Sequence, residues 1–167
     1  MKKIISFVLI TSLFMVSMFS NEQSFNKGFS IGGVWEANYT TAGGGVEIGF
    51  PLVKEKDNGF LLRNHIVLSG KGGNGKGGAF ISDKLIIGGF CSNTYFRAKG
   101  YGLVSIAGGA FGKYNDMPFS LSIDCGGGFE FQFSKFQSFM VEFGGTFPFL
   151  GYMKSSPFVE MGFRTYF

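Results

Sequence analysis

The feature that most limits the fold of this 167-residue chain is an alternation of apolar and polar residues near its C-terminal end. From Phe119 to Phe133 every second residue, beginning with Phe119, is apolar or small, whereas Asp124 and Glu130 fall in the other set. Two later stretches, 139–149 and 158–167, repeat the pattern with glutamate and arginine in the second set. Alternate residues of a β-strand point to opposite faces, so each stretch predicts a strand with one apolar and one ionic face.

The same pattern extends over the chain and predicts an all-β, up-and-down antiparallel barrel of about eight strands. The expected strands are 29–39, 46–53, 60–69, 84–91, 95–112, 119–133, 139–149 and 158–167. Segments rich in turn-forming residues separate them: 40–44, 54–59, 70–78, 92–94, 113–118, 134–137 and 150–157. The register of the third to fifth strands stays open because glycine interrupts their alternation. Most strands hold about ten residues, the length that a tilted strand needs to cross a bilayer.

Composition and charge disfavour three other classes of protein. The chain holds 28 Gly and 23 Phe, which suit helices poorly. Its formal charge of +4, with no basic stripe, is too small to predict a nucleic-acid partner. The glycine-rich segment 70–78 is expected to be a flexible loop rather than a phosphate loop, because Gly77 follows Lys76 where a phosphate loop needs Ser or Thr.

The N-terminal residues 1–20 have the pattern of a cleavable secretory signal peptide. Lys2 and Lys3 precede an apolar run from Ile4 to Phe19, which is shorter than the roughly 20 residues of a spanning helix. We expect cleavage after Ser20, with an uncleaved anchor as the alternative. Residues 21–28 would then be a short lead-in and 29–167 the barrel domain.

The distribution of charge between the two faces distinguishes a membrane barrel from a soluble one. A soluble barrel points its charges outward, whereas here the large apolar side chains form one continuous face and the acids gather on the other. A sheet in lipid must close on itself, with an apolar outside and a polar inside. We therefore expect a transmembrane barrel. Aromatic residues near the strand ends would form the girdles at the membrane interfaces: Phe29, Tyr39, Phe119, Phe133, Phe149 and Phe158.

The inward face predicts a polar network in the lumen. Its members would be Glu36, Glu47, Arg63, His65, Asp124, Glu130, Glu142, Glu160 and Arg164, joined by Arg97 and Lys99. An eight-stranded barrel has room only for side chains, so these buried charges must pair. Inner glycines would make room for the long side chains: Gly126, Gly128, Gly144 and Gly162. The network is expected to be a structural plug, with a narrow polar conduit as the alternative; no metal and no other cofactor is expected.

The last nine residues, Val159 to Phe167, resemble the C-terminal β-signal of outer-membrane proteins. Phe167 matches the terminal aromatic residue, Tyr166 lies beside it, and Phe163 shares the outward face of Phe167, although Thr165 is less apolar than usual. With the eight strands and the signal peptide, the whole mature chain resembles the small outer-membrane barrels of the OmpX, OmpW and OmpA-transmembrane type. The resemblance implies a bacterial outer-membrane location, contact with its lipid, and recognition of the last strand by the barrel-assembly machinery.

Two short motifs suggest other functions. His65 with Ser69 and a carboxylate would suit a lipid-modifying enzyme, although a hydrogen-bonding lumen histidine is the favoured interpretation. Gly33 and Trp35 match the Gly-x-Trp of lipocalin first strands, whereas an outward Trp35 in the lipid interface is favoured here.

The two cysteines are expected to be free thiols. Cys91 and Cys125 lie on strands two steps apart, roughly 9–10 Å across the sheet. A disulfide needs Cα atoms within about 7 Å.

The leading functional hypothesis is a non-enzymatic outer-membrane barrel with a structural role or limited passage of small solutes. A surface interaction or adhesion protein is the alternative. The outer loops, which are the first, third, fifth and seventh connections, are short and offer no evident large adhesive surface.

Overall fold

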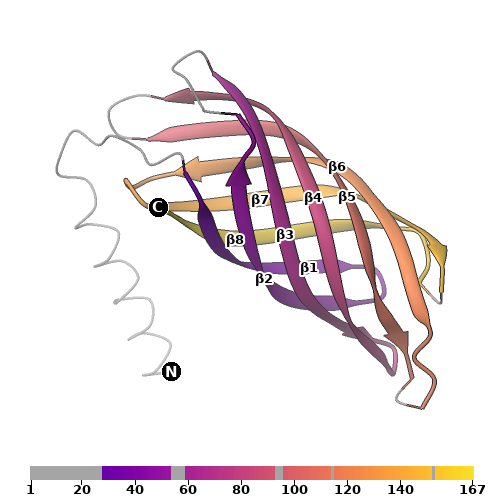
Figure 1. Cartoon of the computed structure of the whole chain (residues 1–167). Helices are drawn as coiled ribbons and strands as arrows, with labels where there is room; N and C mark the ends of the chain where they lie inside the picture. The colour runs from indigo at the N-terminus through magenta and orange to yellow at the C-terminus, as the bar shows by residue number, and fades with distance from the viewer. Residues whose placement is uncertain (1–27, 54–58, 93–95, 114, 152) are drawn as a thin grey trace, which may run out of the picture.

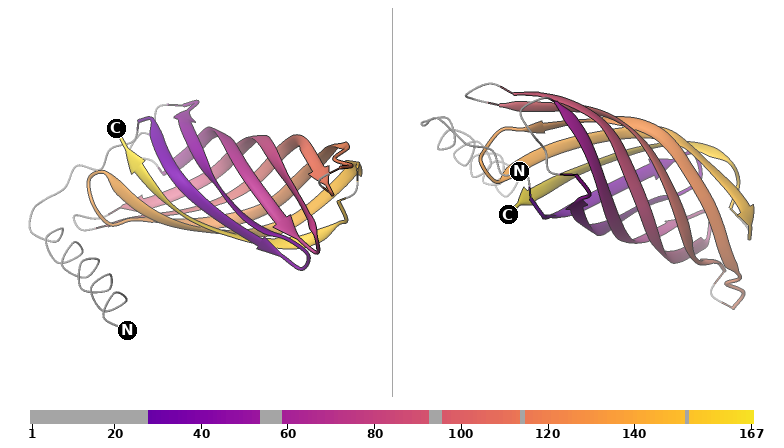
Figure 2. Two further views of the ribbon diagram at one scale, coloured as in Figure 1. Left: turned by 90° about the horizontal axis from the view of Figure 1, so that it is seen from below. Right: turned by 45° about the horizontal axis from the view of Figure 1, so that its top comes forward.

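Eight antiparallel strands close into one barrel, in which every strand pairs with its sequence neighbours and β1 pairs with β8 (Figures 1 and 2). The computed structural model describes residues 28–53, 59–92, 96–113, 115–151 and 153–167. The strands are β1 (Ser30–Asn38), β2 (Ala42–Pro51), β3 (Phe60–Gly73), β4 (Lys76–Ser92), β5 (Arg97–Gly112), β6 (Phe119–Gln132), β7 (Gln137–Leu150) and β8 (Ser156–Tyr166). The expected signal peptide lies outside the described residues, as does the expected lead-in except for Gly28.

No helix among the described residues is long and apolar enough to span a lipid bilayer.

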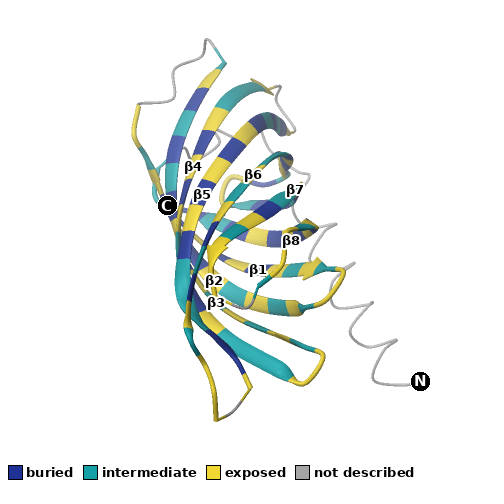
Figure 3. Ribbon diagram, turned by 90° about the vertical axis from the view of Figure 1, so that its right-hand side faces the viewer, coloured by how far each residue is buried: buried dark blue, intermediate teal, exposed yellow. Residues whose placement is uncertain are grey.

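The alternation predicted from the sequence divides the strands into an inner and an outer face, visible as bands of colour in Figure 3. Phe129 and Phe131 on β6 are 54% and 52% exposed, whereas Glu130 between them is 1% exposed. On β7, Glu142 is fully buried beside an exposed Phe143. The large apolar side chains therefore form the outside of the barrel and the carboxylates its interior.

The segment 70–78 is a β-hairpin, so the expected flexible loop was wrong. β3 continues to Gly73, β4 begins at Lys76, and only Asn74 and Gly75 connect them. Both connecting residues have positive φ, 54° and 70°. This is the signature of a type I′ turn, whose twist matches that of the strands it joins. An Asn-Gly pair between two glycine-rich strands was the overlooked sequence feature.

Several strands are longer than the ten residues expected from a minimal membrane crossing. β4 has 17 residues and β5 has 16, whereas β1 has only 9. Both termini of the barrel lie at one end, where the Phe167 amide donates to the Phe29 carbonyl at 2.8 Å. Because the strands differ in length, the rim of the barrel is uneven in height.

One side chain lies on the opposite face from the one predicted, and one acidic side chain for which no face was predicted points outward. Phe158, assigned to an interfacial girdle, is buried inside the barrel against a cluster of Leu61, Ile86, Tyr101 and Leu103. Asp83 is exposed on the outer face of β4, where the Asn64 amide donates to its carboxylate. The apolar outer wall thus carries a hydrogen-bonded polar pair between β3 and β4, two strands whose register the sequence left open.

Cys91 and Cys125 are both free and exposed, and β5 lies between their strands. The prediction of free thiols is confirmed.

Candidate functional site

An arginine on the last strand forms the hub of the barrel interior. Arg164 Nη1 donates to Glu130 Oε2 at 2.6 Å, and Nη2 donates to Glu142 Oε1 at 3.1 Å. The Nε and Nη2 groups also both contact Glu47, which makes that pair bidentate. The guanidinium group suits this position because its planar fork can serve several carboxylates at once. Arg164 therefore connects β8 with β2, β6 and β7 across the lumen.

Lys84 on β4 completes the ionic bridge and was missing from the predicted set. Its Nζ donates to Glu142 Oε2 at 2.7 Å and to Glu160 Oε1 at 2.6 Å. Leu85 and Ile87 are exposed, whereas Lys84 and Ile86 are buried on the inner face. The sequence did not reveal this, because Leu85, Ile86 and Ile87 are all apolar and hide the alternation. The glycines that follow, Gly88 and Gly89, obscured the register.

Two tyrosine hydroxyls also bind carboxylates that Arg164 contacts, and each binds a different glutamate. The Tyr166 hydroxyl donates to Glu130 Oε1 at 2.6 Å and accepts from Lys99 Nζ at 2.7 Å, while Lys99 also donates to Glu130 Oε1 at 2.8 Å. The Tyr101 hydroxyl donates to Glu142 Oε1 at 2.9 Å. Sequence reasoning placed Tyr166 in the assembly signal and missed Tyr101, since neither residue carries a charge.

The structure thus brings four of the predicted glutamates into one network with three cations. The glutamates are Glu47, Glu130, Glu142 and Glu160, and the cations are Arg164, Lys84 and Lys99. Each carboxylate has at least one cationic partner, which is the condition for keeping charges in so narrow a space. We call this set the lumen network.

His65 contacts the edge of the lumen network. Its Nδ1 lies 3.3 Å from Glu47 Oε2, and the side chain is fully buried. Ser69 is four residues further along β3, about 13 Å away at the rise of a strand. The geometry therefore gives no support to a catalytic pair of His65 and Ser69, and no lipid chain has access to the imidazole.

Three other predicted members lie outside the lumen network. Arg63 Nη2 donates to the Gly28 carbonyl at 2.6 Å, and its guanidinium group lies 5.0 Å from the centre of the Tyr166 ring. Glu36 forms an ion pair with Lys71 at 2.6 Å. Asp124 accepts from the Ser105 hydroxyl at 2.9 Å.

Arg97, which was expected to join the network, is fully buried with its guanidinium group 3.6 Å from the centre of the Phe90 ring.

The inner glycines have two different roles. A Cβ atom on Gly128 would lie 2.8 Å from Glu142 Cγ and from the Tyr101 ring, so this glycine makes room for network side chains. Gly126 and Gly144 instead face each other across β6 and β7, and a Cβ on either would meet the backbone of the opposite strand. For those two positions the prediction of space for side chains was wrong.

Next to the network is a polar cavity of about 20 Å³, enough for one water molecule. Lys84, Ser105, Asp124 and Glu160 are among the residues that line it. Among the described residues, no group of three or more His, Cys, Asp or Glu side chains is placed to hold a metal ion.

Replacing Arg164 with methionine is expected to lower the free energy of unfolding by about 3–5 kcal/mol, because three buried carboxylates lose a cationic partner. Urea unfolding in lipid vesicles, followed by the fluorescence of Trp35, measures the loss. Lys71→Met, which removes an ion pair near the rim, is the control and should cost less. Equal stability of the Arg164→Met variant and the unchanged chain would contradict the role of Arg164 as the hub.

The sequence and the structure were compared with those of known proteins. No protein-family profile and no curated protein matches the sequence. Among solved structures, the chain is similar to the N-terminal β-barrel domain of OprF from Pseudomonas aeruginosa, with a TM-score of 0.66, 12% identity, and coverage of 85% of this chain and 98% of that one. Ail, the attachment invasion locus protein of Yersinia pestis, aligns with a TM-score of 0.48 and 12% identity over 83% of this chain and 95% of its own. The chain therefore has the same closed β-barrel fold as the OprF domain.

Proposed function

We propose that the chain is an integral β-barrel protein of a bacterial outer membrane. The observation that carries this proposal is the inversion of the two faces. Phe143 and Phe163 are 49% and 60% exposed on the outer wall, whereas Glu142 and Arg164 beside them are buried in the lumen. Exposure of such an apolar wall to water would be unfavourable, whereas lipid acyl chains would solvate it. The closed sheet also has no edge strand that would expose unpaired backbone groups to lipid.

The last strand supports a second part of the proposal, recognition by the barrel-assembly machinery. Phe163 and Phe167 are both exposed on the outer face of the barrel end, as a signal read from outside requires. Tyr166 differs from them because its side chain points inward and is fully buried. We therefore assign recognition to Phe163 and Phe167, and a stabilising role in the closed barrel to Tyr166.

The packing of the lumen favours a structural role over passage of solutes. Met140, Glu142 and Tyr166 have no exposed surface, and Arg164 is 1% exposed. A continuous water path through the barrel would give these side chains exposed surface. The lumen network therefore acts as a plug in this conformation, and any passage would require ion pairs to separate.

The position of Trp35 provides a direct test of the membrane location. It is the only tryptophan of the chain and is 73% exposed on the outer wall. In vesicles, lipids with brominated acyl chains should quench its fluorescence strongly, and aqueous iodide should quench it weakly. Strong quenching by iodide, with a chain that stays monomeric without detergent, would instead indicate a soluble barrel.

Planar-bilayer recordings test the closed lumen. The refolded chain should give no steady channels, because the lumen network fills the cross-section. The double variant Lys84→Ala, Glu160→Ala removes both ion pairs of Lys84 from the lumen, while Glu142 keeps Arg164 and Tyr101 as partners. This variant should conduct more often. Steady channels from the unchanged chain would favour the alternative of a narrow conduit.

The polar pair of Asn64 and Asp83 allows a test of whether this part of the outer wall faces lipid. Replacing Asn64 and Asp83 together with leucine should raise the free energy of unfolding in vesicles by about 1 kcal/mol, since charged side chains on the lipid face are destabilising. Denaturant titration in vesicles measures the change. Asp116→Leu, on the exposed β5–β6 connection, is the control and should show no such gain. A loss of stability in the double variant would place this part of the wall outside the lipid.

A further inference from the structure

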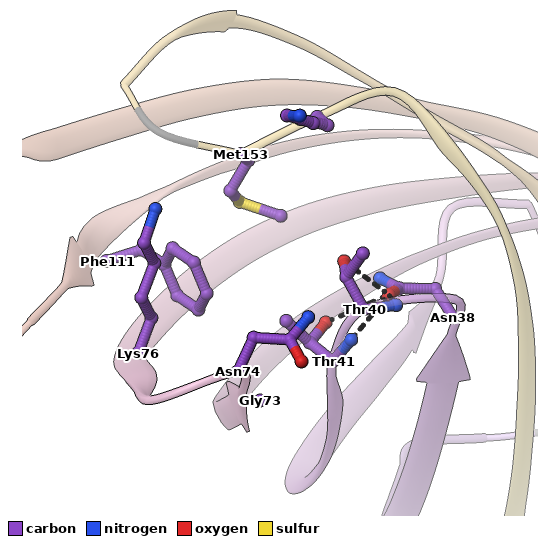
Figure 4. Close-up of a pocket in the computed structure, with 9 residues that line it drawn as sticks. Asn38, Thr40, Thr41, Gly73, Asn74, Lys76, Phe111 and Met153 are labelled. Carbon is purple, nitrogen blue, oxygen red and sulfur yellow. Dashed lines mark hydrogen bonds between the residues drawn. The ribbon is translucent and has the colours of Figure 1, made fainter.

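The end of the barrel opposite the termini contains a cavity of about 230 Å³ (Figure 4). Four separate parts of the chain line it: the β1–β2 turn, the β3–β4 hairpin, the end of β5 and the β7–β8 connection. The lining residues are Asn38, Thr40, Thr41, Gly73, Asn74, Lys76, Phe111, Met153 and Lys154. These parts belong to the first, third, fifth and seventh connections of the barrel, which are the outer ones when both termini face the periplasm. In that orientation this cavity, which we call the mouth cavity, opens to the outside of the cell.

The walls of the mouth cavity are held in place by backbone contacts and short hydrogen bonds. Asn38 Oδ1 accepts from the backbone amides of Thr40 and Thr41 at 3.0 and 2.8 Å, which fixes the β1–β2 turn. This turn packs directly on the hairpin, because a Cβ atom on Gly73 would lie 2.0 Å from the Thr40 carbonyl oxygen. The side of the cavity made by the β1–β2 turn and the β3–β4 hairpin is therefore formed before any ligand arrives, which lowers the entropic cost of binding.

The lining is cationic. It includes Lys76 and Lys154, and none of the described residues that line the cavity carries a carboxylate. The nearby Glu36 is neutralised by its ion pair with Lys71. Lysine ammonium groups bind phosphate as point charges, and the Asn74 amide adds a neutral donor.

One side of the mouth cavity is apolar. The Phe111 ring is buried, and Figure 4 shows the Met153 side chain reaching into the cavity across from Asn74. The volume is below the roughly 300 Å³ at which sites for drug-sized ligands begin. Space of this size suits a single ring with one anionic group, in which the ring contacts Phe111 and Met153.

We propose that the mouth cavity binds a small phosphate-bearing sugar, with Lys76 and Lys154 on the phosphate and Phe111 and Met153 on the ring. The same chemistry occurs in free sugar phosphates and in the phosphorylated sugar headgroups of lipids. The inference takes from the proposed function only the side of the membrane that the cavity faces. Its test therefore uses the refolded full chain in non-ionic detergent and a buffer without phosphate.

Calorimetric titration with glucose 6-phosphate is the primary measurement. We expect saturable binding, weakened by salt, with glucose and inorganic phosphate each binding more weakly because each lacks one half of the contacts. The double variant Lys76→Gln, Lys154→Gln should weaken binding by about tenfold or more, since two charge-assisted hydrogen bonds are lost. Lys135→Gln, an exposed lysine of the β6–β7 turn at the other end of the barrel, is the matched control and should bind as the unchanged chain does.

Two further arms complete the test. Gly73→Ala should also weaken binding, because its methyl group would separate the hairpin from the β1–β2 turn; unfolding curves of the same sample show that the barrel itself is intact. A micelle-embedded lipid with a phosphorylated sugar headgroup that displaces glucose 6-phosphate would identify the lipid as the source, and failure to displace it would identify the soluble sugar. Absence of glucose 6-phosphate binding, or unchanged binding by the double lysine variant, would overturn the proposal. Neither result depends on whether the barrel inserts in a membrane.

Discussion

The pairing of Arg164 with three glutamates is the interaction on which the rest of the structure depends. A barrel of eight strands encloses too little space for bulk water, so charges that point inward must neutralise one another. Arg164 satisfies Glu47, Glu130 and Glu142 at once, and Lys84 and Lys99 provide the remaining partners. The apolar outer wall and the ionic interior both result from one alternation along the strands. The interior can hold its buried charges only because of these ion pairs.

The sequence was sufficient to predict the fold class, because the alternation that indicates it can be seen within single strands. Alternation with a period of two survives in single strands such as β6, β7 and β8, where Phe and Glu residues take turns along the chain. It failed where glycine removed the contrast between the two faces. Around Gly88 and Gly89 the inward position of Lys84 and the outward position of Asp83 were both overlooked, and the glycines of 70–78 concealed a hairpin whose strands continue to the Asn74–Gly75 turn.

The composition of the lumen network was harder to predict than its existence. Alternation assigns a face to each residue but gives no information on which side chains meet across the lumen. Arg63 illustrates the limit, because it points inward as expected and yet contacts the Gly28 carbonyl and the Tyr166 ring near the barrel end. Tyr101 and Tyr166 illustrate the converse, because uncharged side chains occupy central positions among the carboxylates. Which side chains meet across the lumen depends on how the strands are staggered relative to one another. The sequence of a single strand does not specify that stagger.

The pairing of β1 with β8 has a consequence for the order in which the barrel forms. Ser30 pairs with Tyr166, so the contact that closes the sheet joins the two most distant parts of the domain in the sequence. Contacts of such high sequence separation form late, since a long loop must be closed first. The hub of the ionic interior lies on the same late strand, so Glu47, Glu130 and Glu142 lack their guanidinium partner until β8 docks. Closure of the sheet and completion of the lumen network therefore depend on the same eleven-residue strand.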